Sequence, residues 1–373
     1  MVVGVPKEIK TNEKRVSLLP HLVKEITQLG HSVVVQKEAG IESGIGDNSY
    51  AQEGATILSS IEEVYAQADI IVKVKEPLDL ELALIRDSQI IFTFFHFAAD
   101  EKLLQKFINT NAIAVAYETV EDSSKALPLL TPMSEIAGRM AVQNGAKYLE
   151  GTYGGKGVLL SGVPGVSPAT VTIIGGGVVG LNSAKLAAGL GAKVNILDID
   201  MSRLRYLDNI MPLNVFTHHS NSHTINKLLP KTDLLIGGVL VPGSKAPKII
   251  SKKMLSLMKK GSVIVDVAVD QGGCIETTKP TTHEDPIYDV DGIVHYCVAN
   301  MPGAVPQTST VSLTNCTSSY ILELLKEDFF SSNLNSNAIR KGVNIYKGKI
   351  THKGLAESFN LPYENISSAM SLK

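Results

Sequence analysis

Several residue types that mark particular classes of protein are scarce in this sequence. It has no tryptophan, 5% aromatic residues and three cysteines, Cys274, Cys297 and Cys316. An odd number of cysteines without a C-x-x-C spacing predicts neither a disulfide framework nor a zinc site, and suits buried thiols in a reducing cytoplasm. We assign the pair His218 and His219 to a loop, since nothing nearby completes a set of metal ligands. No metal is expected.

An excess of one charge and long apolar runs are also missing. The 35 basic and 37 acidic side chains leave a net charge of −2, whereas a nucleic-acid-binding protein would show a basic stripe with interleaved aromatic residues. Glycine, proline or charge interrupts every apolar run well before the ~20 residues needed to cross a bilayer. The N-terminus lacks a charged-then-apolar signal pattern. We expect a cytoplasmic protein without nucleic-acid or membrane partners.

What the sequence does contain is an alternation of short β-branched runs with amphipathic helical patterns. Leu22, Val23 and Ile26 fall at helical spacing, and Gly30 is a plausible end of that helix. This alternation predicts a parallel sheet with helices on both faces. The strands expected in this part are Val2–Val5, Ser32–Val35, Ile70–Val74, Ile90–Phe95 and Ile113–Ala116.

A length of 373 residues predicts two domains. Near Leu129 the pattern changes, and we expect Ser134 to be the N-cap of a helix. A glycine-rich loop or hinge follows over Gly151–Gly165. The expected fold class is α/β, with two doubly wound parallel-sheet (Rossmann-like) domains separated by a cleft. The strands expected in the second domain are Thr170–Ile174, Lys193–Leu197, Asp233–Ile236, Ser262–Val267 and Ile293–Val298.

The C-terminal part is predicted to be helical, from about Thr308 to Phe329 and from about Asn335 to Tyr346. We expect this part to return to the first domain. Residues 1–128 and 307–373 would then form a substrate and catalytic domain, and residues 129–306 an NAD-binding Rossmann domain. Two chain crossings over one cleft suit opening and closing.

The strongest local signal is a glycine-rich turn between an expected strand and an apolar helix. Gly175, Gly177 and Gly180 have the spacing G-x-G-x-x-G, and Val178 and Val179 lie between the last two glycines. The first glycine permits a positive φ, the second lets the backbone approach a pyrophosphate, and the third lets helix and strand pack closely. The helix N-terminus adds N–H groups and a partial positive charge for the phosphate.

A carboxylate follows at the end of the next expected strand. Asp198 comes about 18 residues after Gly180, where the 2′-hydroxyl of an adenosine ribose needs an acceptor. A carboxylate there also repels a 2′-phosphate, so NAD should be preferred over NADP. The alternative without a ligand is a tight βα turn followed by an exposed aspartate.

The first domain contains a cluster of a different kind. Lys75 and His96 end two expected strands, at the sheet edge where parallel α/β folds bind ligands, and Arg15 precedes them. Arginine can hold a carboxylate through two hydrogen bonds, lysine adds a charge, and histidine can exchange a proton near neutral pH. Each has an ordinary structural interpretation: a solvated arginine, a lysine that ends a strand, or a partly buried histidine with satisfied hydrogen bonds.

In the second domain, Asp270 lies just beyond an expected buried strand and before two glycines. A carboxylate there would face the expected cleft, although an aspartate in a turn is the alternative. The segment 295–303 follows the next strand and could lay its backbone along a nicotinamide ring.

These segments resemble the alanine dehydrogenase family along nearly the full chain. Besides the glycine turn, the resemblance rests on residues 4–10 (GVPKEIK), 13–16 (EKRV), 72–77 (VKVKEP), 129–140 (LLTPMSEIAGRM), 265–273 (VDVAVDQGG) and 298–306 (VANMPGAVP). It implies reversible NAD-dependent oxidation of L-alanine to pyruvate and ammonia, in a homo-oligomer that is a hexamer. The α-hydrogen would leave as hydride, and water would add to the resulting iminium.

The resemblance also implies roles for individual residues. Arg15 and Lys75 would hold the substrate carboxylate, while His96 and Asp270 would carry the proton chemistry, with the main proton acceptor left open. The implied NAD contacts are Ser134, Val178, Val179, Asp198, Arg203, Ser220, Val239, Leu240, Val267, Ala268, Val269, Asp270, Val298, Ala299, Asn300 and Met301.

Two positions depart from the family pattern, namely Gln307, where many members have a basic residue, and Lys279, where arginine is frequent. Two other functions stay open on the sequence. One is the soluble nucleotide-binding subunit of a proton-translocating transhydrogenase, and the other is a non-catalytic NAD-binding module. The breadth of small L-amino acids accepted and the physiological direction are also open.

Overall fold

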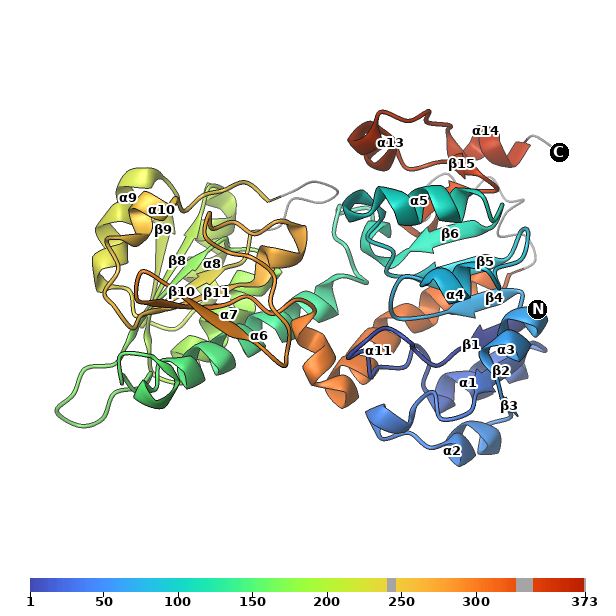
Figure 1. Cartoon of the computed structure of the whole chain (residues 1–373), viewed down its shortest axis with the longest axis horizontal. Coiled ribbons are helices and arrows are strands. Elements are labelled where there is room, and N and C mark those ends of the chain that lie inside the picture. The colour runs from blue at the N-terminus through green and yellow to red at the C-terminus, as the bar shows by residue number, and fades with distance from the viewer. Residues whose placement is uncertain (240–245, 327–337, 372–373) are drawn as a thin grey trace. The chain divides into compact units, whose positions relative to one another are not determined.

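The computed structural model describes residues 1–239, 246–326 and 338–371. It divides the chain into two compact units. The first unit comprises Met1–Met133 and Gly303–Lys373, and the second comprises Ser134–Pro302. The chain therefore leaves the first unit, forms the second without interruption, and returns, as Figure 1 shows by its colours.

The described part of the first unit contains an eight-stranded sheet in the order β15-β14-β6-β5-β4-β1-β2-β3. The pairs from β6 to β3 are parallel, whereas β14 runs antiparallel to β6, and β15 runs antiparallel to β14. In Figure 1 the red C-terminal strands thus extend the sheet beyond the cyan β6. The strands are β1 (Val2–Val5), β2 (Ser32–Gln36), β3 (Thr56–Leu58), β4 (Ile70–Val72), β5 (Ile90–Thr93), β6 (Ile113–Ala116), β14 (Val343–Tyr346) and β15 (Lys349–Ile350).

Helices connect the parallel strands, as in a doubly wound fold. The α-helices of the first unit are α1 (Pro20–Gln28), α2 (Asp47–Gln52), α3 (Ile61–Gln67), α4 (Asp79–Leu82), α5 (Glu101–Ile108), α11 (Pro306–Leu324), α12 (Ala338–Lys341), α13 (Lys353–Phe359) and α14 (Ile366–Ser371). Short 3-10 helices are η1 (Ile41–Ser43), η2 (Phe97–Ala99) and η3 (Tyr117–Thr119). Helix η2 follows β5 and helix η3 follows β6, in the region that carries the candidate site.

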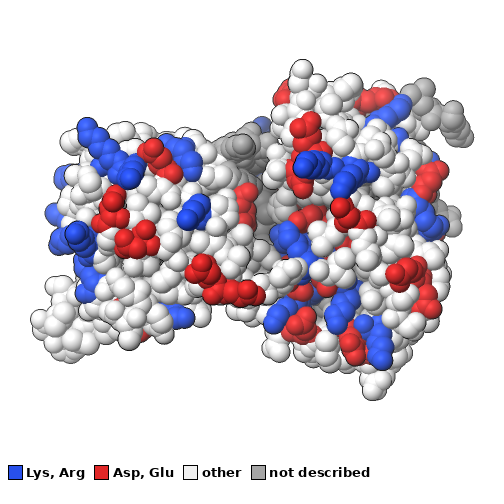
Figure 2. Space-filling view, in the orientation of Figure 1, with Lys and Arg blue, Asp and Glu red and all other residues white. Residues whose placement is uncertain are grey.

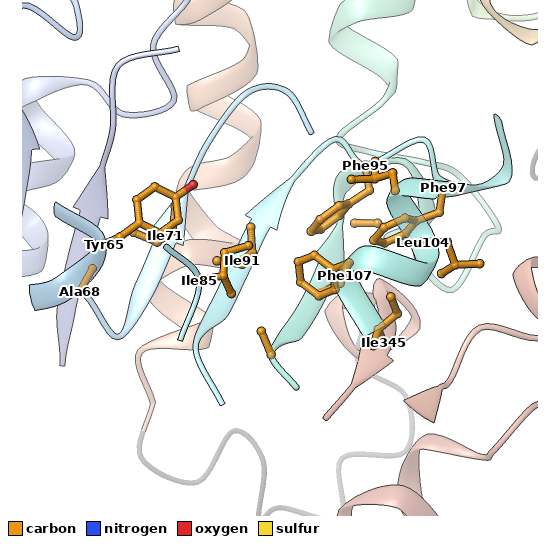
Figure 3. Close-up of a cluster of buried hydrophobic side chains, with 14 of the residues drawn as sticks. Tyr65, Ala68, Ile71, Ile85, Ile91, Phe95, Phe97, Leu104, Phe107 and Ile345 are labelled. Carbon is orange, nitrogen blue, oxygen red and sulfur yellow. The ribbon is translucent and has the colours of Figure 1, made fainter. Parts of the chain in front are cut away.

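An aromatic core anchors the chain that follows β5. The rings of Phe95 and Phe97 stack with centroids 4.4 Å apart, and Phe107 of α5 meets Phe95 edge-on at 5.1 Å. Figure 3 shows these three rings gathered with Leu104 and Ile345. Fully burying a phenylalanine side chain stabilises the fold by roughly 2 kcal/mol. The residue between Phe95 and Phe97 is therefore fixed by core packing on both sides.

The described part of the second unit contains a seven-stranded sheet in the order β12-β13-β11-β10-β7-β8-β9. Its pairs are parallel except for β12, which is antiparallel to β13. The strands are β7 (Thr170–Ile174), β8 (Lys193–Asp198), β9 (Val215–His219), β10 (Leu234–Gly237), β11 (Val263–Asp266), β12 (Ile287–Val290) and β13 (Ile293–Tyr296). Buried aliphatic side chains of neighbouring strands, among them Ile174, Leu197, Leu235 and Ile264, form its core.

The α-helices of this unit are α7 (Val178–Gly189), α8 (Met201–Ile210), α9 (Ser222–Leu228) and α10 (Lys252–Leu255), and α6 (Thr131–Tyr148) crosses from the first unit. Its 3-10 helices are η4 (Gly151–Tyr153), η5 (Leu229–Lys231) and η6 (Val267–Gln271), and η7 (Met301–Ala304) crosses back. Among the described residues, no helix combines the length and apolarity required to span a bilayer. Acidic and basic side chains are interspersed over both units on the face in Figure 2.

Three sequence predictions are wrong. Ser134 is not an N-cap, because α6 already begins at Thr131, whose N–H donates to the Leu127 carbonyl at 3.0 Å. Pro132 fits in this first turn, where a missing N–H costs little. His218 and His219 do not form a loop but end β9.

The third error concerns the C-terminal part, where a helix was expected to run to Tyr346. Residues 343–346 instead form β14 beside β6, and within the described residues only Ala338–Lys341 of that stretch is helical. A short apolar run does not distinguish strand from helix by periodicity, and the available edge of β6 decides the outcome. The expected end of the preceding helix at Phe329 lies outside the described residues, and α11 ends at Leu324.

Candidate functional site

In the first unit, two predicted site residues follow the carboxyl ends of neighbouring parallel strands. Lys75 comes after β4 and His96 after β5, and these strands pair with Ile71 opposite Ile91. Arg15, from the loop before α1, is buried together with Lys75. Both cations act electrostatically on the imidazole of His96. The structure therefore brings Arg15, Lys75 and His96 together in one unit.

A buried carboxylate orients Arg15. Nε of Arg15 donates to Oε1 of Glu13 at 2.6 Å, and Nη2 donates to Oε2 at 2.6 Å. Nη1 of Arg15 contacts the sulfur of Met133 at 3.0 Å. Burial would raise the pKa of Glu13, but the hydrogen bonds and charge of Arg15 outweigh it and lower the pKa to about 2. Both partners thus stay charged, and the planar guanidinium is locked in one orientation.

A second glutamate holds the backbone that carries Lys75. Oε1 of Glu8 accepts a hydrogen bond from the N–H of Val74 at 2.6 Å, while its Oε2 lies 3.3 Å from Nζ of Lys73. The carbonyl of Lys75 accepts a hydrogen bond from the Thr93 hydroxyl at 2.9 Å, which ties the ends of β4 and β5 together. These bonds fix the position at which the Lys75 side chain leaves the sheet edge.

The backbone of His96 adopts an unusual conformation that a third glutamate supports. His96 has φ of 53° and ψ of 33°, in the left-handed region that non-glycine residues seldom occupy. Its N–H donates to Oε1 of Glu118 at 2.7 Å. Its ring lies parallel to that of Phe94, with centroids 5.7 Å apart.

The surroundings of His96 keep its imidazole neutral. Burial lowers the pKa of His96 well below its ordinary value, and the positive charges of Lys75, Lys10 and Arg15 lower it further, in that order. A neutral imidazole has the unprotonated ring nitrogen that a general base requires.

The sequence analysis missed four charged residues around these three, namely Glu8, Lys10, Glu13 and Glu118. For Glu13 a signal existed, because it stands two positions before Arg15 in a segment that the resemblance already includes. Glu118 follows β6 in the way that His96 follows β5, so the edge rule that selected His96 would have selected it too. Glu8 and Lys10 also stand in such a segment, residues 4–10, but neither lies next to a predicted site residue in the sequence.

In the second unit, the glycine turn has the geometry that its sequence predicts. Gly175 has φ of 99°, and a Cβ on Gly180 would lie 1.9 Å from the carbonyl oxygen of Gly175. Both positions therefore require glycine. At Gly177, which precedes the first residue of α7, a Cβ would meet no atom within 4 Å. The N-terminus of α7, with Val178 and Val179 in its first turn, is thus approachable by a ligand.

Asp198 ends β8 beside the glycine turn. Its Oδ2 accepts a hydrogen bond from the N–H of Gly176 at 2.7 Å, and its Oδ1 accepts one from the N–H of Asp200 at 2.9 Å. Arg203 donates from Nε to the carbonyl of Gly176 at 2.5 Å. The N–H of Ser220 donates to the Asp198 carbonyl at 2.9 Å. The sheet edge thus gathers the glycine turn with three of the side chains predicted to contact NAD.

The remaining predicted NAD contacts lie on loops after other strands. Val239 follows β10, and its Cγ2 would lie 3.0 Å from a Cβ on Gly175. Val267, Ala268, Val269 and Asp270 form η6 directly after β11. Val298, Ala299 and Asn300 follow β13, and Met301 begins η7. Ser134 lies in α6, where the second unit begins, and Leu240 lies outside the described residues.

A hydrogen bond joins the two turns that carry Asp270 and Asn300. The N–H of Asn300, a residue with φ of 55°, donates to Oδ2 of Asp270 at 3.2 Å. Buried Asp266 supports the Asp270 turn, since its carboxylate accepts from the N–H of Ala268 at 3.1 Å and of Cys274 at 3.0 Å. The exposed carboxylate of Asp270 therefore accepts the N–H of Asn300 and lies on a turn that Asp266 supports. Within the described ranges, no three histidine, cysteine or carboxylate side chains gather as a metal site.

Comparison with known proteins identifies the family. The model described as "Alanine dehydrogenase/PNT, N-terminal domain" matches residues 4–137, and "Alanine dehydrogenase/PNT, C-terminal domain" matches residues 141–353. The chain belongs to the alanine dehydrogenase/PNT family. The resemblance found in the sequence is thereby confirmed.

Relatives of this family match the chain from end to end. The alanine dehydrogenase of Methanococcus maripaludis is 50% identical, covering 99% of this chain and 100% of the relative. That of Staphylococcus haemolyticus is 47% identical, covering 99% of each chain. A solved L-alanine dehydrogenase matches with a TM-score of 0.91 and 46% identity, over 96% of this chain and 99% of that one. This match confirms the predicted α/β fold class.

A solved transhydrogenase from Sinorhizobium meliloti also matches, with a TM-score of 0.80 and 23% identity, over 94% of this chain and 100% of that one. At this identity the likeness shows a shared fold and no more.

Proposed function

We propose that the protein catalyses the reversible NAD-dependent oxidative deamination of L-alanine to pyruvate and ammonia. The observation that carries the proposal is the grouping of two buried cations, Arg15 and Lys75, around a histidine that burial and charge keep neutral. Two cations can bind the carboxylate of a small substrate, and the neutral histidine can accept a proton during its reaction. The full-length likeness to alanine dehydrogenases supports L-alanine as that molecule.

In the proposed reaction, Arg15 and Lys75 hold the carboxylate of alanine. The Glu13 carboxylate fixes one edge of the guanidinium, so that Arg15 needs no reorganisation when the substrate arrives. The charge of Lys75 adds attraction for the carboxylate without demanding a particular direction. Together they orient the α-carbon of the substrate.

His96 and Asp270 carry the protons in the proposal. A neutral His96 can take a proton from the water that adds to the oxidised substrate, and the exposed Asp270 carboxylate can do the same. Which of the two is the main acceptor is left to kinetics. Both units contribute residues to the proposed reaction, with His96 in the first and Asp270 in the second.

The second unit fits NAD as the hydride acceptor. Bound NAD⁺ would supply the redox chemistry by accepting the α-hydrogen of the substrate as hydride. The open N-terminus of α7 beside Gly177 suits a pyrophosphate, and Asp198 stands where a ribose hydroxyl needs an acceptor. We accordingly assign substrate binding and the proton chemistry of His96 to the first unit, and NAD binding together with the carboxylate of Asp270 to the second.

We further propose a cytoplasmic homo-oligomer, a hexamer as the family resemblance implies. Light scattering on purified protein measures the number of subunits, and a monomer would contradict this part of the proposal. A transhydrogenase subunit is the less favoured function, since the full-length relatives at 47% and 50% identity are alanine dehydrogenases, whereas the solved transhydrogenase is 23% identical. A non-catalytic NAD-binding module would not require Arg15, Lys75 and His96 in one cluster.

The experiment that tests the proposal is a panel of small L-amino acids with NAD⁺, followed by NADH absorbance. We expect L-alanine to be among the best substrates, with pyruvate formed in the same amount as NADH. The reverse reaction should consume NADH only when pyruvate and ammonium are both present. Binding of NAD without turnover of any amino acid would contradict the proposal.

A further inference from the structure

The pairing of β5 with β6 places a carboxylate beneath the backbone of His96. Thr93 lies opposite Ala116 at the ends of the two parallel strands. The chains continue side by side, so that Glu118 faces the Phe95–His96 peptide. Oε1 of Glu118 accepts from the N–H of His96 at 2.7 Å, and Oε2 accepts from the N–H of Phe95 at 3.3 Å. One side chain thus binds two successive backbone donors.

This contact lies at a residue whose backbone conformation is unfavourable. His96 has a φ of 53°, a conformation that costs a non-glycine residue about 1–2 kcal/mol and persists only where its surroundings impose it. The buried rings of Phe95 and Phe97 fix the chain on either side of His96. Between them, the Glu118 carboxylate holds the N–H of His96 itself.

The imidazole of His96 is not oriented by a hydrogen bond from its own ring. Among the described residues, no hydrogen bond to its ring nitrogens is found, although catalytic histidines are often oriented through one. Its ring instead lies parallel to the ring of Phe94, with an interplanar angle of 4°. The direction of the imidazole therefore depends on this stacking and on the position of the His96 backbone.

We propose that Glu118 is a positioning residue that acts through His96, holding the backbone of residues 95 and 96 so that the imidazole keeps its place beside Lys75. This inference rests on the proposed function, because it requires His96 to take part in the reaction. In this role the oxygens of Glu118 accept the two backbone N–H groups, and Glu118 transfers no proton. Burial raises the pKa of Glu118 to about 7, so the test has to separate positioning from proton transfer.

Two substitutions separate positioning from proton transfer. Glu118→Gln keeps an oxygen that can accept the His96 N–H but cannot act as an acid or base at neutral pH. Glu118→Ala removes both acceptors. If Glu118 positions His96, the Gln variant should keep kcat within about threefold of wild type, while the Ala variant should lose about thirtyfold, as expected for misplacing a catalytic group by a fraction of an ångström. The KM values for pyruvate and ammonium should change little.

A double-mutant cycle supplies the decisive readout. When Glu118→Ala is added to His96→Ala, we expect no further loss of kcat, because the group that Glu118 positions is already gone. Glu121→Gln is the matched control: it neutralises a partly exposed glutamate three positions away that pairs with Lys341, and should leave kcat unchanged. Circular dichroism and melting temperature confirm that each variant is folded.

The outcomes distinguish this inference from the proposed function. A wild-type protein inactive with L-alanine would overturn the proposed function. An active wild type with an inactive His96→Ala would leave the proposed function in place, and the inference would then be overturned by any one of three results: unchanged kcat in Glu118→Ala, loss in Glu118→Gln as large as in His96→Ala, or additive losses in the double variant. Rescue by glutamine with a non-additive cycle would establish it.

Discussion

The candidate residues of the first unit act through ionisable side chains, whereas those of the second act largely through backbone that glycine exposes. Arg15, Lys75 and His96 are each supported by a different glutamate, at Glu13, Glu8 and Glu118 respectively. In the second unit, the glycine turn offers the N-terminus of α7, and acidic side chains serve to hold turns in place.

This difference indicates how each unit can select its ligand. Side chains that buried carboxylates hold in place can recognise the charge pattern of a small substrate. Neutralising one of these carboxylates should therefore displace the side chain that it holds. A turn defined by glycine can approach a phosphate, and an added methyl group disturbs it. Substitutions of the two kinds should therefore have separable effects on substrate and on cofactor.

The largest effect is expected at the proton-transferring residues. His96→Ala and Asp270→Ala should each lower kcat for alanine oxidation at least about a hundredfold, because each removes a candidate acid or base. Steady-state NADH formation measures the loss. His21→Ala, which alters an exposed histidine of α1 in the same unit, is the control. Near-normal turnover in either of the first two variants would remove that residue from the mechanism.

The next largest effect concerns the glycine turn. Gly177→Ala adds a methyl group where the protein has open space, so the melting temperature should not change. If the pyrophosphate approaches here, the Kd for NAD⁺ should rise by about tenfold to a hundredfold. This change corresponds to the free energy of one hydrogen bond to a charged group. Titration calorimetry measures the Kd.

Gly189→Ala serves as the matched control, because Gly189 ends the same helix and its Cβ would also meet nothing within 4 Å. It should leave the Kd unchanged and should not lower the melting temperature, because alanine favours a helix more than glycine does. Equal NAD affinities for the two variants would show that the ligand does not approach Gly177.

A smaller effect is expected at Glu13, whose neutralisation releases Arg15. Glu13→Gln should raise the KM for alanine about tenfold by loosening the guanidinium, and should destabilise the fold by about 3 kcal/mol by breaking a buried pair. Since Arg15 lowers the pKa of Glu13 from 4.5 to about 2, this stabilisation is present above pH 4.5 and is lost as the pH falls towards 2.

Denaturant unfolding of wild type and Glu13→Gln across the acid range checks that window. The difference in stability between the two should shrink from pH 5 downwards. Glu42→Gln, which removes an exposed pair with Lys14, is the control and should be close to neutral. A KM for alanine that stays at the wild-type value in Glu13→Gln would show that Glu13 does not orient Arg15 for the substrate.

The smallest effect is expected in the choice between NAD and NADP. Asp198→Asn keeps an oxygen for the Gly176 N–H but removes the charge that would repel a 2′-phosphate. We expect the ratio of kcat/KM for NAD⁺ over NADP⁺ to fall about tenfold. An unchanged ratio would contradict the proposal that Asp198 binds the adenosine ribose. Loss of activity with both cofactors would indicate that Asp198 only supports the glycine turn.

The sequence predicts most of this fold because buried parallel strands have strong signals. The bounds of β1, β6 and β7 match the expected ranges, each a short β-branched run bounded by turn residues. Strands β3, β9, β12, β14 and β15 were not predicted. Four of them, β3, β9, β12 and β15, form the edges of the two sheets, where burial is weaker and the apolar pattern fades.

The candidate site is predictable where function lies in local motifs. The glycine turn with Asp198, and Lys75 and His96 after their strands, can be selected from spacing alone. The contacts of the supporting glutamates cannot be predicted in this way, because Glu118 reaches His96 only through the pairing of β5 with β6, and Glu8 reaches Val74 across the sheet edge. Such contacts depend on strand order, which no single segment encodes.

The central claim is that substrate binding and the proton chemistry of His96 belong to the first unit, and that cofactor binding belongs to the second. It is tested most directly by titrating NAD⁺ onto the His96→Ala variant in a calorimeter and assaying the same sample with L-alanine. The account predicts a Kd for NAD⁺ within about twofold of wild type, together with almost no NADH formation. Loss of NAD⁺ affinity in parallel with activity would contradict it.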